Sequence, residues 1–410
     1  MTRPTPGPIT IDITRLIGRA LRGRSPTGID RVGLEYVRHY RDAAHALVRI
    51  GPVWLEPGRR ASRRLFEDLL HGRLRRTLAV RAMDIATDAL WQLCLSEAGA
   101  RPVLNPLHSG TERPSYGSRL LLRGRRMVYV LHDLIPLMHP QYSRPGEDAR
   151  HRQRLATLLD IATAVVANSQ DTATRFLGYA QAAGSTPPPV TVAPLGVTRL
   201  PPPGPAPLDR PYFVVVGTIE PRKNHALLLQ VWRRLAVELG DATPVLVVIG
   251  RRGWECEHVV DFLERCPETR RHVREVSYAD DAQLAGWLAR ACALLFPTFA
   301  EGYGLPVTEA LSVGLPVIAS DLPVFRESVG DIPDYLDPLD GPAWHQAVLD
   351  YLAPDHARRV RQLQRMGRFV APTWEVHFSI VDGIIGPLTQ SAGAPADPST
   401  GTLEAAVSRS

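Results

Sequence analysis

The sequence predicts an α/β protein with two doubly wound domains, in which helices cover parallel sheets. Short apolar runs typical of buried strands alternate with helical patterns along most of the 410 residues. This length favours two domains, and 44% hydrophobic residues are enough for two cores. The Pro-rich segment 201–211, PPPGPAPLDRP, suits neither helix nor sheet, so we expect a stiff linker there.

The β-α alternation is clear on both sides of this linker. In the first domain, residues 1–200, the expected strands are 9–13, 127–131, 164–167 and 190–193, with helices at 29–41 and 150–161. In the second domain, residues 212–373, the expected strands are 212–216, 245–249, 293–296 and 316–319, with helices at 226–239, 282–290 and 306–313. A last helix, 374–388, is expected to cross back to the first domain. Residues 389–410 have the small, polar composition of a disordered tail.

Positive charge is concentrated in the first half of the chain. Residues 1–200 hold 29 arginines against 16 acidic residues, although the net charge of the whole chain is only +6. Such a domain could face nucleic acid, anionic lipid or a phosphorylated substrate. Aromatic residues are only 7% and no nucleic-acid-binding motif occurs, so we expect no nucleic-acid partner.

The sequence also bears on the location of the protein. It holds no run of the roughly 20 apolar residues that a membrane span needs, and its N-terminus lacks a signal pattern. We therefore expect a cytoplasmic protein, or one that is peripheral on the inner membrane face. The four cysteines are scattered without metal or redox spacing and are expected to be reduced. Nothing in the sequence indicates the oligomeric state.

The segment from Arg59 to Arg76 has two interpretations. Leu65, Phe66 and Leu69 recur at near-helical spacing, with arginines flanking them. This pattern is typical of an amphipathic helix on an anionic membrane. It is equally typical of an ordinary surface helix whose apolar stripe packs on the core, and the sequence leaves both open.

Lys223 is the single lysine of the chain, which otherwise contains 47 arginines. It lies in the sequence GTIEPRKN at 217–224, directly after the expected strand 212–216, where a helix begins. Helix starts after buried strands are common phosphate sites. An ammonium is compact and a guanidinium is broad, so a tight phosphate pocket can accept one and exclude the other. The alternative is that this lysine is a chance survivor.

A second motif, EGYGLPVTE, runs from Glu301 to Glu309. Gly302 and Gly304 permit a tight turn, and Pro306 suits the first turn of a helix, so an anion could rest on that helix N-terminus. The two carboxylates would then lie on either side of a bound diphosphate and suit sugar hydroxyls.

These motifs, with 276–284 between them and GLPVIAS at 314–320 after them, resemble retaining glycosyltransferases of family 4. The resemblance covers 212–330. It implies the GT-B fold, in which two Rossmann-like doubly wound domains face each other across a cleft. The implied donor is a nucleoside diphosphate sugar, with UDP or GDP expected, and no cofactor is required. Thr218 departs from the family, because many relatives carry arginine after Gly217, so part of the phosphate clamp is missing or supplied elsewhere.

The resemblance also implies roles for individual residues. Arg222 and Lys223 would bind the diphosphate and stabilise the leaving group, and Glu301 would contact sugar hydroxyls. The other residues implied to bind the donor are Gly28, Gly217, Thr218, Val276, Ser277, Gly302, Tyr303, Gly304, Leu305, Thr308 and Glu309. Within this set Glu309 would contact the ribose, Val276 and Ser277 the base, and the amides around Gly304 and Leu305 the sugar or phosphate.

Three positions of the first domain are weaker candidates. His132, after the strand 127–131, resembles a family histidine beside the transferred sugar, and Asp133 could orient it. A structural histidine is the alternative. Gly28 could let the loop before the expected first long helix approach phosphate or acceptor, or could simply belong to a helix cap. Arg31 is a possible acceptor contact.

The function expected from the resemblance is transfer of a hexose-type sugar to an acceptor hydroxyl with retention, by a front-face mechanism. With a basic first domain, the expected acceptor is lipid-linked or a polysaccharide, at an anionic bacterial membrane. Arg222, Lys223 and a helix N-terminus can neutralise a diphosphate, so no metal is expected. A nucleotide-sugar epimerase or hydrolase of GT-B fold, or a non-catalytic nucleotide-sugar-binding subunit, is the alternative.

Overall fold

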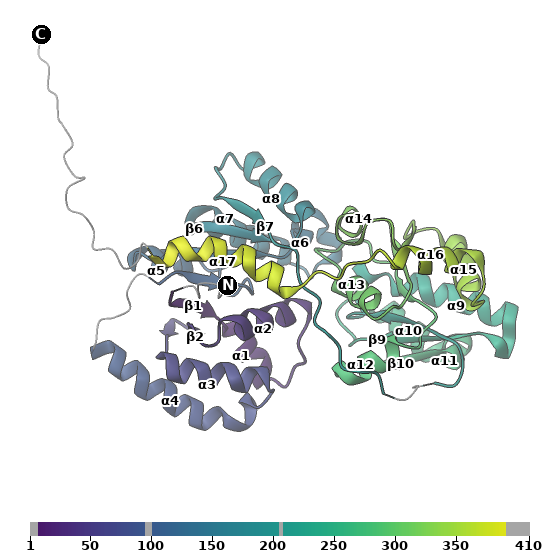
Figure 1. Ribbon diagram of the computed structural model, residues 1–410, viewed down its shortest axis with the longest axis horizontal. Coiled ribbons are helices and arrows are strands. Elements are labelled where there is room, and N and C mark those ends of the chain that lie inside the picture. The colour runs from purple at the N-terminus through teal and green to yellow at the C-terminus, as the bar shows by residue number, and fades with distance from the viewer. Residues whose placement is uncertain (1–6, 95–100, 205–207, 391–410) are drawn as a thin grey trace, which may run out of the picture.

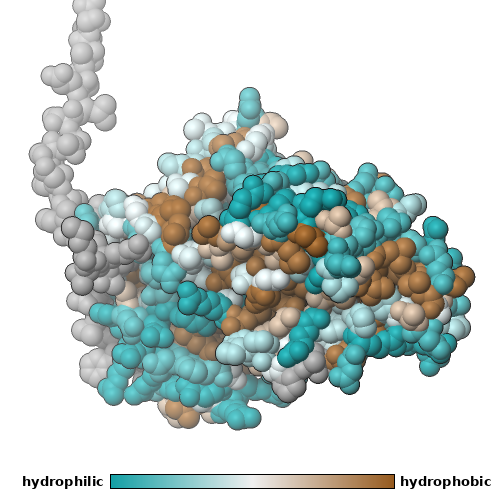
Figure 2. Space-filling view, turned by 45° about the vertical axis from the view of Figure 1, so that its right-hand side comes forward, coloured by the Kyte–Doolittle hydropathy of each residue, from teal (hydrophilic) through white to brown (hydrophobic). Residues whose placement is uncertain are grey.

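The computed structural model describes residues 7–94, 101–204 and 208–390. These residues form two lobes, each with its own sheet, and the last helix returns from the second lobe to the first (Figure 1). Hydrophilic residues cover most of the face seen in Figure 2, and hydrophobic residues form smaller areas between them.

The first domain contains a seven-stranded sheet in the order β3-β2-β1-β4-β5-β6-β7. Its strands are β1 (Ile9–Asp12), β2 (Ala44–Ile50), β3 (Val53–Leu55), β4 (Val103–Asn105), β5 (Met127–Leu131), β6 (Ala162–Ala167) and β7 (Val190–Val192). All neighbours are parallel except β2 and β3. This hairpin was not expected from the sequence. It turns at Gly51, where φ is 57° and a residue with a Cβ would be strained.

Eight helices of the described residues belong to this domain. They are α1 (Thr14–Leu21), α2 (Gly28–Tyr40), α3 (Arg59–Leu70), α4 (Leu74–Cys94), α5 (Pro114–Leu122), α6 (Ile135–Met138), α7 (Glu147–Ile161) and α8 (Gln170–Ala182). Helix α2 begins with a capping box, in which Asp30 accepts hydrogen bonds from the backbone N–H and hydroxyl of Thr27. That cap fixes where the chain enters α2, immediately beside the cleft.

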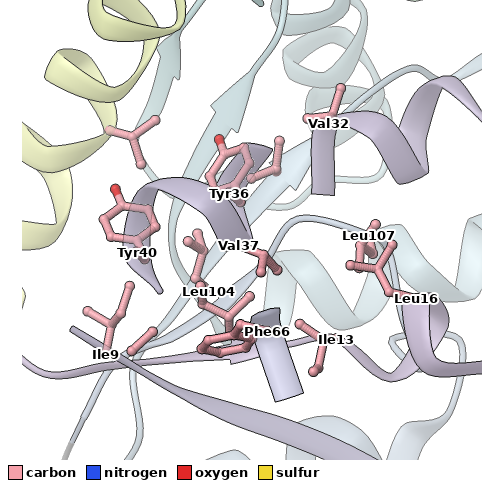
Figure 3. Packing of buried hydrophobic residues seen from close by; sticks show 14 of the residues in the cluster. Ile9, Ile13, Leu16, Val32, Tyr36, Val37, Tyr40, Phe66, Leu104 and Leu107 are labelled. Carbon is pink, nitrogen blue, oxygen red and sulfur yellow. The ribbon is translucent and has the colours of Figure 1, made fainter. Parts of the chain in front are cut away.

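The apolar stripe of α3 faces the core, which decides between the two interpretations for residues 59–70 of this segment. Leu65, Phe66 and Leu69 are 2%, 0% and 8% exposed and belong to a core cluster with residues of α2 and the sheet. Figure 3 shows Phe66 in this cluster. The stripe is therefore not available to a membrane. No helix among the described residues is both long and apolar enough to cross a bilayer.

The second domain contains a six-stranded parallel sheet in the order β10-β9-β8-β11-β12-β13. Its strands are β8 (Tyr212–Val216), β9 (Val245–Ile249), β10 (Val273–Val276), β11 (Leu294–Phe296), β12 (Val317–Ser320) and β13 (Asp334–Leu336). The chain winds outward from β8 to β10 and then returns to β11 on the other side of β8. This reversal creates a crevice at the carboxyl ends of β8 and β11, where ligands bind in open α/β sheets.

The helices of this domain cover both faces of its sheet. They are α9 (His225–Leu239), α10 (Glu257–Arg265), α11 (Pro267–His272), α12 (Asp281–Leu288), α13 (Leu305–Ser312), α14 (Pro323–Val329), α15 (Gly341–Leu352) and α16 (Ala357–Met366). The cysteines described here, Cys256, Cys266 and Cys292, are free thiols.

Helix α17 (Trp374–Gln390) packs on α2 of the first domain. His377 Nε2 lies 2.8 Å from the hydroxyl of Tyr36, and the Tyr40 hydroxyl donates to Asp382 at 2.7 Å. Figure 3 shows both tyrosines between the core and this yellow helix. The helix continues to Gln390, so the expectation that a tail starts at 389 was wrong by two residues. The rest of that expected tail, 391–410, lies outside the described residues.

Candidate active site

The loops after β5, β8 and β11 meet at a central cavity of about 300 Å³ between the domains. Its lining includes most of the residues that the sequence motifs singled out. Those residues are Gly28, His132, Gly217, Thr218, Arg222, Lys223, Glu301, Gly302, Tyr303, Gly304 and Leu305. Positions up to 277 residues apart in the chain thus share one cavity, because parallel strands present their carboxyl ends at the same edge of each sheet.

Lys223 is held at the bottom of a tight turn after β8. Gly217 has φ 149°, and a Cβ at this position would lie 3.3 Å from Lys223 Cε, so a larger residue would press on the lysine stem. The Lys223 ammonium lies 4.5 Å from the centroid of the Phe296 ring and pairs with Oε1 of Glu301. Only 8% of Lys223 is exposed. The ammonium is therefore fixed in position before any ligand binds.

Glu301 is the acceptor at the centre of this cluster. Arg222 Nη1 donates to its Oε1 at 2.7 Å, and the hydroxyl of Thr298 donates to the same oxygen at 3.2 Å. Burial opposes ionisation of Glu301, but Arg222 and Lys223 outweigh it and hold its pKa below the ordinary value. The carboxylate is thus charged at neutral pH.

The pKa values of the two cations in this cluster shift in opposite directions, although burial opposes the charge of both. Burial lowers the pKa of Lys223, and Glu301 counteracts this effect. Burial also disfavours charge on Arg222, yet Glu301 and Glu220 more than compensate and its pKa is raised. Arg222 Nε lies 2.8 Å from Glu220 Oε1, so each cation of the pair has at least one carboxylate partner.

The turn at Gly302 brings the two domains into direct contact. A Cβ on Gly302 would lie 2.2 Å from the carbonyl oxygen of His132. The hydroxyl of Ser169, at the start of α8, donates to the Gly302 carbonyl at 3.2 Å. Tyr303 donates its hydroxyl hydrogen bond to the Leu195 carbonyl at 2.8 Å. Gly302 is therefore required for the domains to close over the cavity as they do here.

His132 is buried against the first domain. Its Nε2 lies 2.8 Å from the Pro106 carbonyl oxygen, and because a carbonyl only accepts, Nε2 carries the proton. Burial lowers the pKa of His132, so the ring is neutral with Nδ1 as its acceptor nitrogen. The expectation that Asp133 orients this ring was wrong, since Asp133 Oδ1 accepts from the Ile135 amide at 3.0 Å and Pro106 holds the ring instead.

Glu309 lies one helical turn into α13, beside a second cavity of about 540 Å³, which we call the Glu309 cavity. Arg31 of α2 reaches across the cleft and places Nη2 2.7 Å from Glu309 Oε1. Burial raises the pKa of Glu309, and Arg31 opposes this rise. Arg31 was expected as an acceptor contact. The structure instead gives it this ion pair, on the side of the cleft that also contains Ser277.

Two expected donor-binding residues line neither the central cavity nor the Glu309 cavity. Thr308 is 0% exposed, and its hydroxyl donates to the Leu305 carbonyl within α13 at 3.0 Å. Val276 packs its side chain on the core of the second domain, and its carbonyl accepts from the Gly250 amide. Tyr278 was missed as a candidate although it follows Ser277. It is 60% exposed and lines the Glu309 cavity.

A third cavity, of about 610 Å³, opens on the other side of the central one, and we call it the arginine cavity. Thr27 and Thr218 border all three cavities, so the three form one continuous cleft. Arg251 lines both the arginine cavity and the Glu309 cavity, and its carbonyl accepts from the Ile219 amide at 2.9 Å. A guanidinium therefore stands next to Thr218, where the expected arginine is missing.

Comparison with known proteins shows which family these motifs resemble. Residues 198–332 match the model of glycosyl transferases group 1. The O-antigen chain mannosyltransferase B of Escherichia coli is 35% identical over 165 residues, which cover 40% of this chain and 42% of that protein. The O-antigen chain mannosyltransferase RfbU of Salmonella typhimurium is 33% identical over 143 residues, which cover 33% of this chain and 37% of that protein. The matched region thus spans less than half the length of these relatives.

Solved structures resemble the whole chain more fully. The sucrose-phosphate synthase from Thermosynechococcus elongatus superposes with a TM-score of 0.62 at 17% identity, over 94% of this chain and all of that one. Anabaena HepE in complex with UDP gives 0.60 at 14% identity, over 94% and 98%. At such identities the likeness shows the fold alone. The chain therefore has the GT-B fold, and its residues 198–332 are similar to the glycosyl transferases group 1 family.

Proposed function

We propose that this protein transfers a hexose-type sugar from a nucleoside diphosphate sugar to an acceptor hydroxyl, with retention of configuration, during assembly of a bacterial polysaccharide or glycolipid. The observation that carries the proposal is the cluster of Arg222, Lys223 and Glu301 in the central cavity between the two domains. Preorganised cations in a site with little water stabilise a leaving diphosphate effectively.

The three cavities suggest how the donor lies. The Glu309 cavity, with Ser277 and Tyr278, has room for the nucleoside, and the central cavity can take the sugar next to Glu301. The diphosphate would then lie near Lys223 and Thr218, with Arg251 in place of the arginine that many relatives carry. The names of the relatives favour mannose as the sugar, and UDP or GDP remains the expected nucleotide.

In the proposed reaction, the bond from the anomeric carbon to the phosphate oxygen breaks while the acceptor oxygen bonds to the same face of that carbon. The acceptor proton passes to the leaving phosphate oxygen. Arg222 and Lys223 stabilise the charge that develops on the diphosphate, Glu301 holds sugar hydroxyls, and neutral His132 can accept a hydrogen bond at Nδ1. No metal is included, in keeping with the sequence expectation.

We also propose that the protein is peripheral on an anionic membrane through its first domain. The support comes from α4 rather than α3. Leu78, Val80 and Met83 are 41%, 60% and 69% exposed, and the arginines at 75 and 76 are exposed on the same helix. Exposed apolar side chains next to cations suit the interface of a bilayer with anionic lipid.

The central proposal is tested by incubating the protein with UDP-, GDP- and ADP-sugars and measuring thermal stabilisation. A ligand at 100 times its Kd adds about 2.7 kcal/mol to the free energy of unfolding. Product linkage is then determined by NMR with the donor that binds. Absence of stabilisation by every nucleotide sugar would refute the proposal, and an inverted anomeric linkage would refute retention.

A further inference from the structure

The arginine cavity carries far more positive charge than a diphosphate bound at Lys223 would need. Besides Arg222, which belongs to the cluster around Glu301, its lining includes Arg15, Arg19, Arg24, Arg144 and Arg251. The first four come from the first domain and Arg251 comes from the second, so the cations converge on the cavity from both walls of the cleft.

The carboxylates near this cavity are too few to balance the arginines. Asp30, 1% exposed, lies 2.8 Å from Nε of Arg15 and 2.7 Å from Nε of Arg19, so one acid serves two cations. Within the described parts of the chain, Arg24 and Arg144 form no ion pair, and neither does Arg251. A net positive charge thus faces an open volume.

The acidic side chains that line the same cavity are occupied elsewhere. Glu147 pairs with Arg154 at 2.6 Å and with Arg150 at 3.2 Å. Glu220 pairs with Arg222 at 2.8 Å. Asp133 accepts from the backbone at Ile135 and acts electrostatically on Arg222. None of these three carboxylates therefore forms an ion pair with Arg24, Arg144 or Arg251.

Two of the guanidinium groups are preorganised by the backbone. The carbonyl oxygen of Ser25 accepts from Arg19 Nη2 at 2.5 Å and from Arg251 Nη2 at 3.4 Å. Burial lowers the pKa of Arg19, and the neighbouring cations Arg15, Arg251 and Arg24 lower it further, against the influence of Asp30. An anion in the cavity would relieve this repulsion between like charges.

The lining also contains flat apolar faces that suit a sugar ring. Trp254 and Tyr142 both border the cavity. Tyr142 is held in position by Phe299, with ring centroids 5.2 Å apart and an interplanar angle of 3°. Ligand sites commonly combine aromatic walls with a few convergent charged groups, and about 610 Å³ is within their usual size range.

A ligand in this cavity would reach the reacting centre. The arginine cavity shares Thr218, Glu220 and Arg222 with the central cavity, whereas Ser277 and Glu309 line the Glu309 cavity and not the arginine cavity. The nucleoside and this ligand would therefore reach the transferred sugar from different cavities.

We propose that the arginine cavity is the acceptor subsite and that it takes a saccharide bearing a phosphate group, with the phosphate bound by Arg24 and Arg144. This inference rests on the proposed glycosyl transfer. Guanidinium groups bind phosphate oxygens in bidentate fashion, so two uncompensated guanidinium groups suit the several charged oxygens of a phosphate group better than a single carboxylate. The phosphate can belong to the reducing end of a lipid-linked acceptor or to a phosphorylated ring within a glycan.

The test compares binding of mannose 1-phosphate, mannose 6-phosphate, glucuronic acid and mannose by calorimetry, each with the nucleoside diphosphate that binds the protein. We expect a sugar phosphate to bind at least about 10-fold more tightly than mannose or glucuronic acid, the scale of one charge-assisted hydrogen bond. Preference for the 1-phosphate assigns the phosphate to a reducing end, and preference for the 6-phosphate assigns it to a glycan ring. Equal binding of mannose and both phosphates would overturn the inference.

The variant pair Arg24→Gln/Arg144→Gln uses arginines that line only the arginine cavity. It should weaken sugar-phosphate binding at least about 10-fold and leave the Kd of the nucleoside diphosphate unchanged. The matched control, Arg22→Gln/Arg152→Gln, removes the same charge from exposed positions outside the cavity and should change neither value. If Arg24→Gln/Arg144→Gln weakens nucleotide binding instead, the arginines belong to the donor site and the inference fails while the proposed function stands. If the unmodified protein binds no nucleotide at all, both fail.

Discussion

Arg31 Nη2 of α2 lies 2.7 Å from Oε1 of Glu309 in α13, so a single ion pair joins the two domains at the edge of the Glu309 cavity. Glu309 is 3% exposed and Arg31 is 28% exposed. The carboxylate therefore depends on this guanidinium for its charge, and a ribose that binds Glu309 has to share the carboxylate with Arg31 or displace it. The relationship makes nucleotide binding and domain contact interdependent.

The Arg31→Ala variant should unfold at a lower temperature than the unmodified protein. Removing the guanidinium leaves a buried carboxylate without its ion-pair partner, which costs about 1–3 kcal/mol. Thermal unfolding at pH 7 measures the difference. Arg38→Ala, on the same helix, is the control, because its i,i+3 pair with Glu35 is half exposed and should contribute about 0.5 kcal/mol or less. Equal effects of the two variants would contradict a buried role for Arg31.

The loss of folding stability caused by Arg31→Ala should also depend on pH. The folded-state pKa of Glu309 is already raised by burial, and loss of Arg31 removes the group that opposes this rise. A raised pKa means that the folded state favours the protonated carboxyl group. Glu309 therefore contributes to the stability of the fold at acidic pH, and this contribution is lost as pH rises through the folded-state pKa. The difference in unfolding temperature between variant and unmodified protein should therefore shrink as the buffer is made more acidic. A difference that stays constant would show that the carboxylate is not the cause.

Residues that belong to sequence motifs could be predicted, whereas contacts that depend on how the two domains pack could not. Lys223 and Glu301 were assigned to one donor site by the resemblance to a family, and the structure brings them together because each follows a strand whose carboxyl end lies at the same edge of the sheet. Arg31 and Glu309 belong to different domains, and no local pattern records the angle at which two domains meet. Their ion pair was therefore not predicted.

Two further differences have local causes. The sequence His132-Asp133 suggested a hydrogen-bonded pair, but Asp133 bonds the amide two residues later, as aspartates after strands often do, and leaves the ring to the Pro106 carbonyl. Thr308 stands next to Glu309, yet neighbours on a helix point about 100° apart, so only one of them can face the cleft.

Lys223→Ala should reduce kcat by about 100-fold, the scale of losing one preorganised charge contact to a leaving group. Lys223→Arg keeps the positive charge and tests whether the shape of the cationic group matters. The ammonium is enclosed by Phe296, Gly217 and Glu301, and a guanidinium is broader, so we expect Lys223→Arg to restore little of the lost activity. Turnover of the donor measures both variants, with thermal unfolding as a check on folding. Full activity of Lys223→Arg would show that charge alone suffices.

Membrane association should depend on α4. Arg75→Glu/Arg76→Glu should release the protein from vesicles that contain anionic lipid, because each basic residue near such a surface contributes about 1 kcal/mol. Sedimentation with vesicles gives the bound fraction. Arg233→Glu/Arg290→Glu changes the charge equally at exposed positions of the second domain and should leave binding intact. Unchanged binding of the α4 variant would assign any membrane contact to another surface.

Gly302→Ala should separate nucleotide binding from catalysis. The new methyl group would lie 2.2 Å from the His132 carbonyl oxygen and 2.9 Å from Asp133 Cβ, and both atoms belong to the opposite domain. The domains must then move apart, which draws His132 and the arginine cavity away from Lys223. We expect kcat to fall by about 100-fold, as expected when reacting groups are displaced by about 1 Å. Nucleotide affinity should fall less than kcat, because the second domain keeps its own fold and most of its contacts with the nucleotide, although the contact between Arg31 and Glu309 is disturbed. Gly178→Ala, in α8, has nothing within 4 Å of the added Cβ and serves as the control.

Small-angle scattering should show a larger radius of gyration for Gly302→Ala than for the control or the unmodified protein. A normal kcat in Gly302→Ala would mean that the close contact between Gly302 and His132 is not needed for turnover.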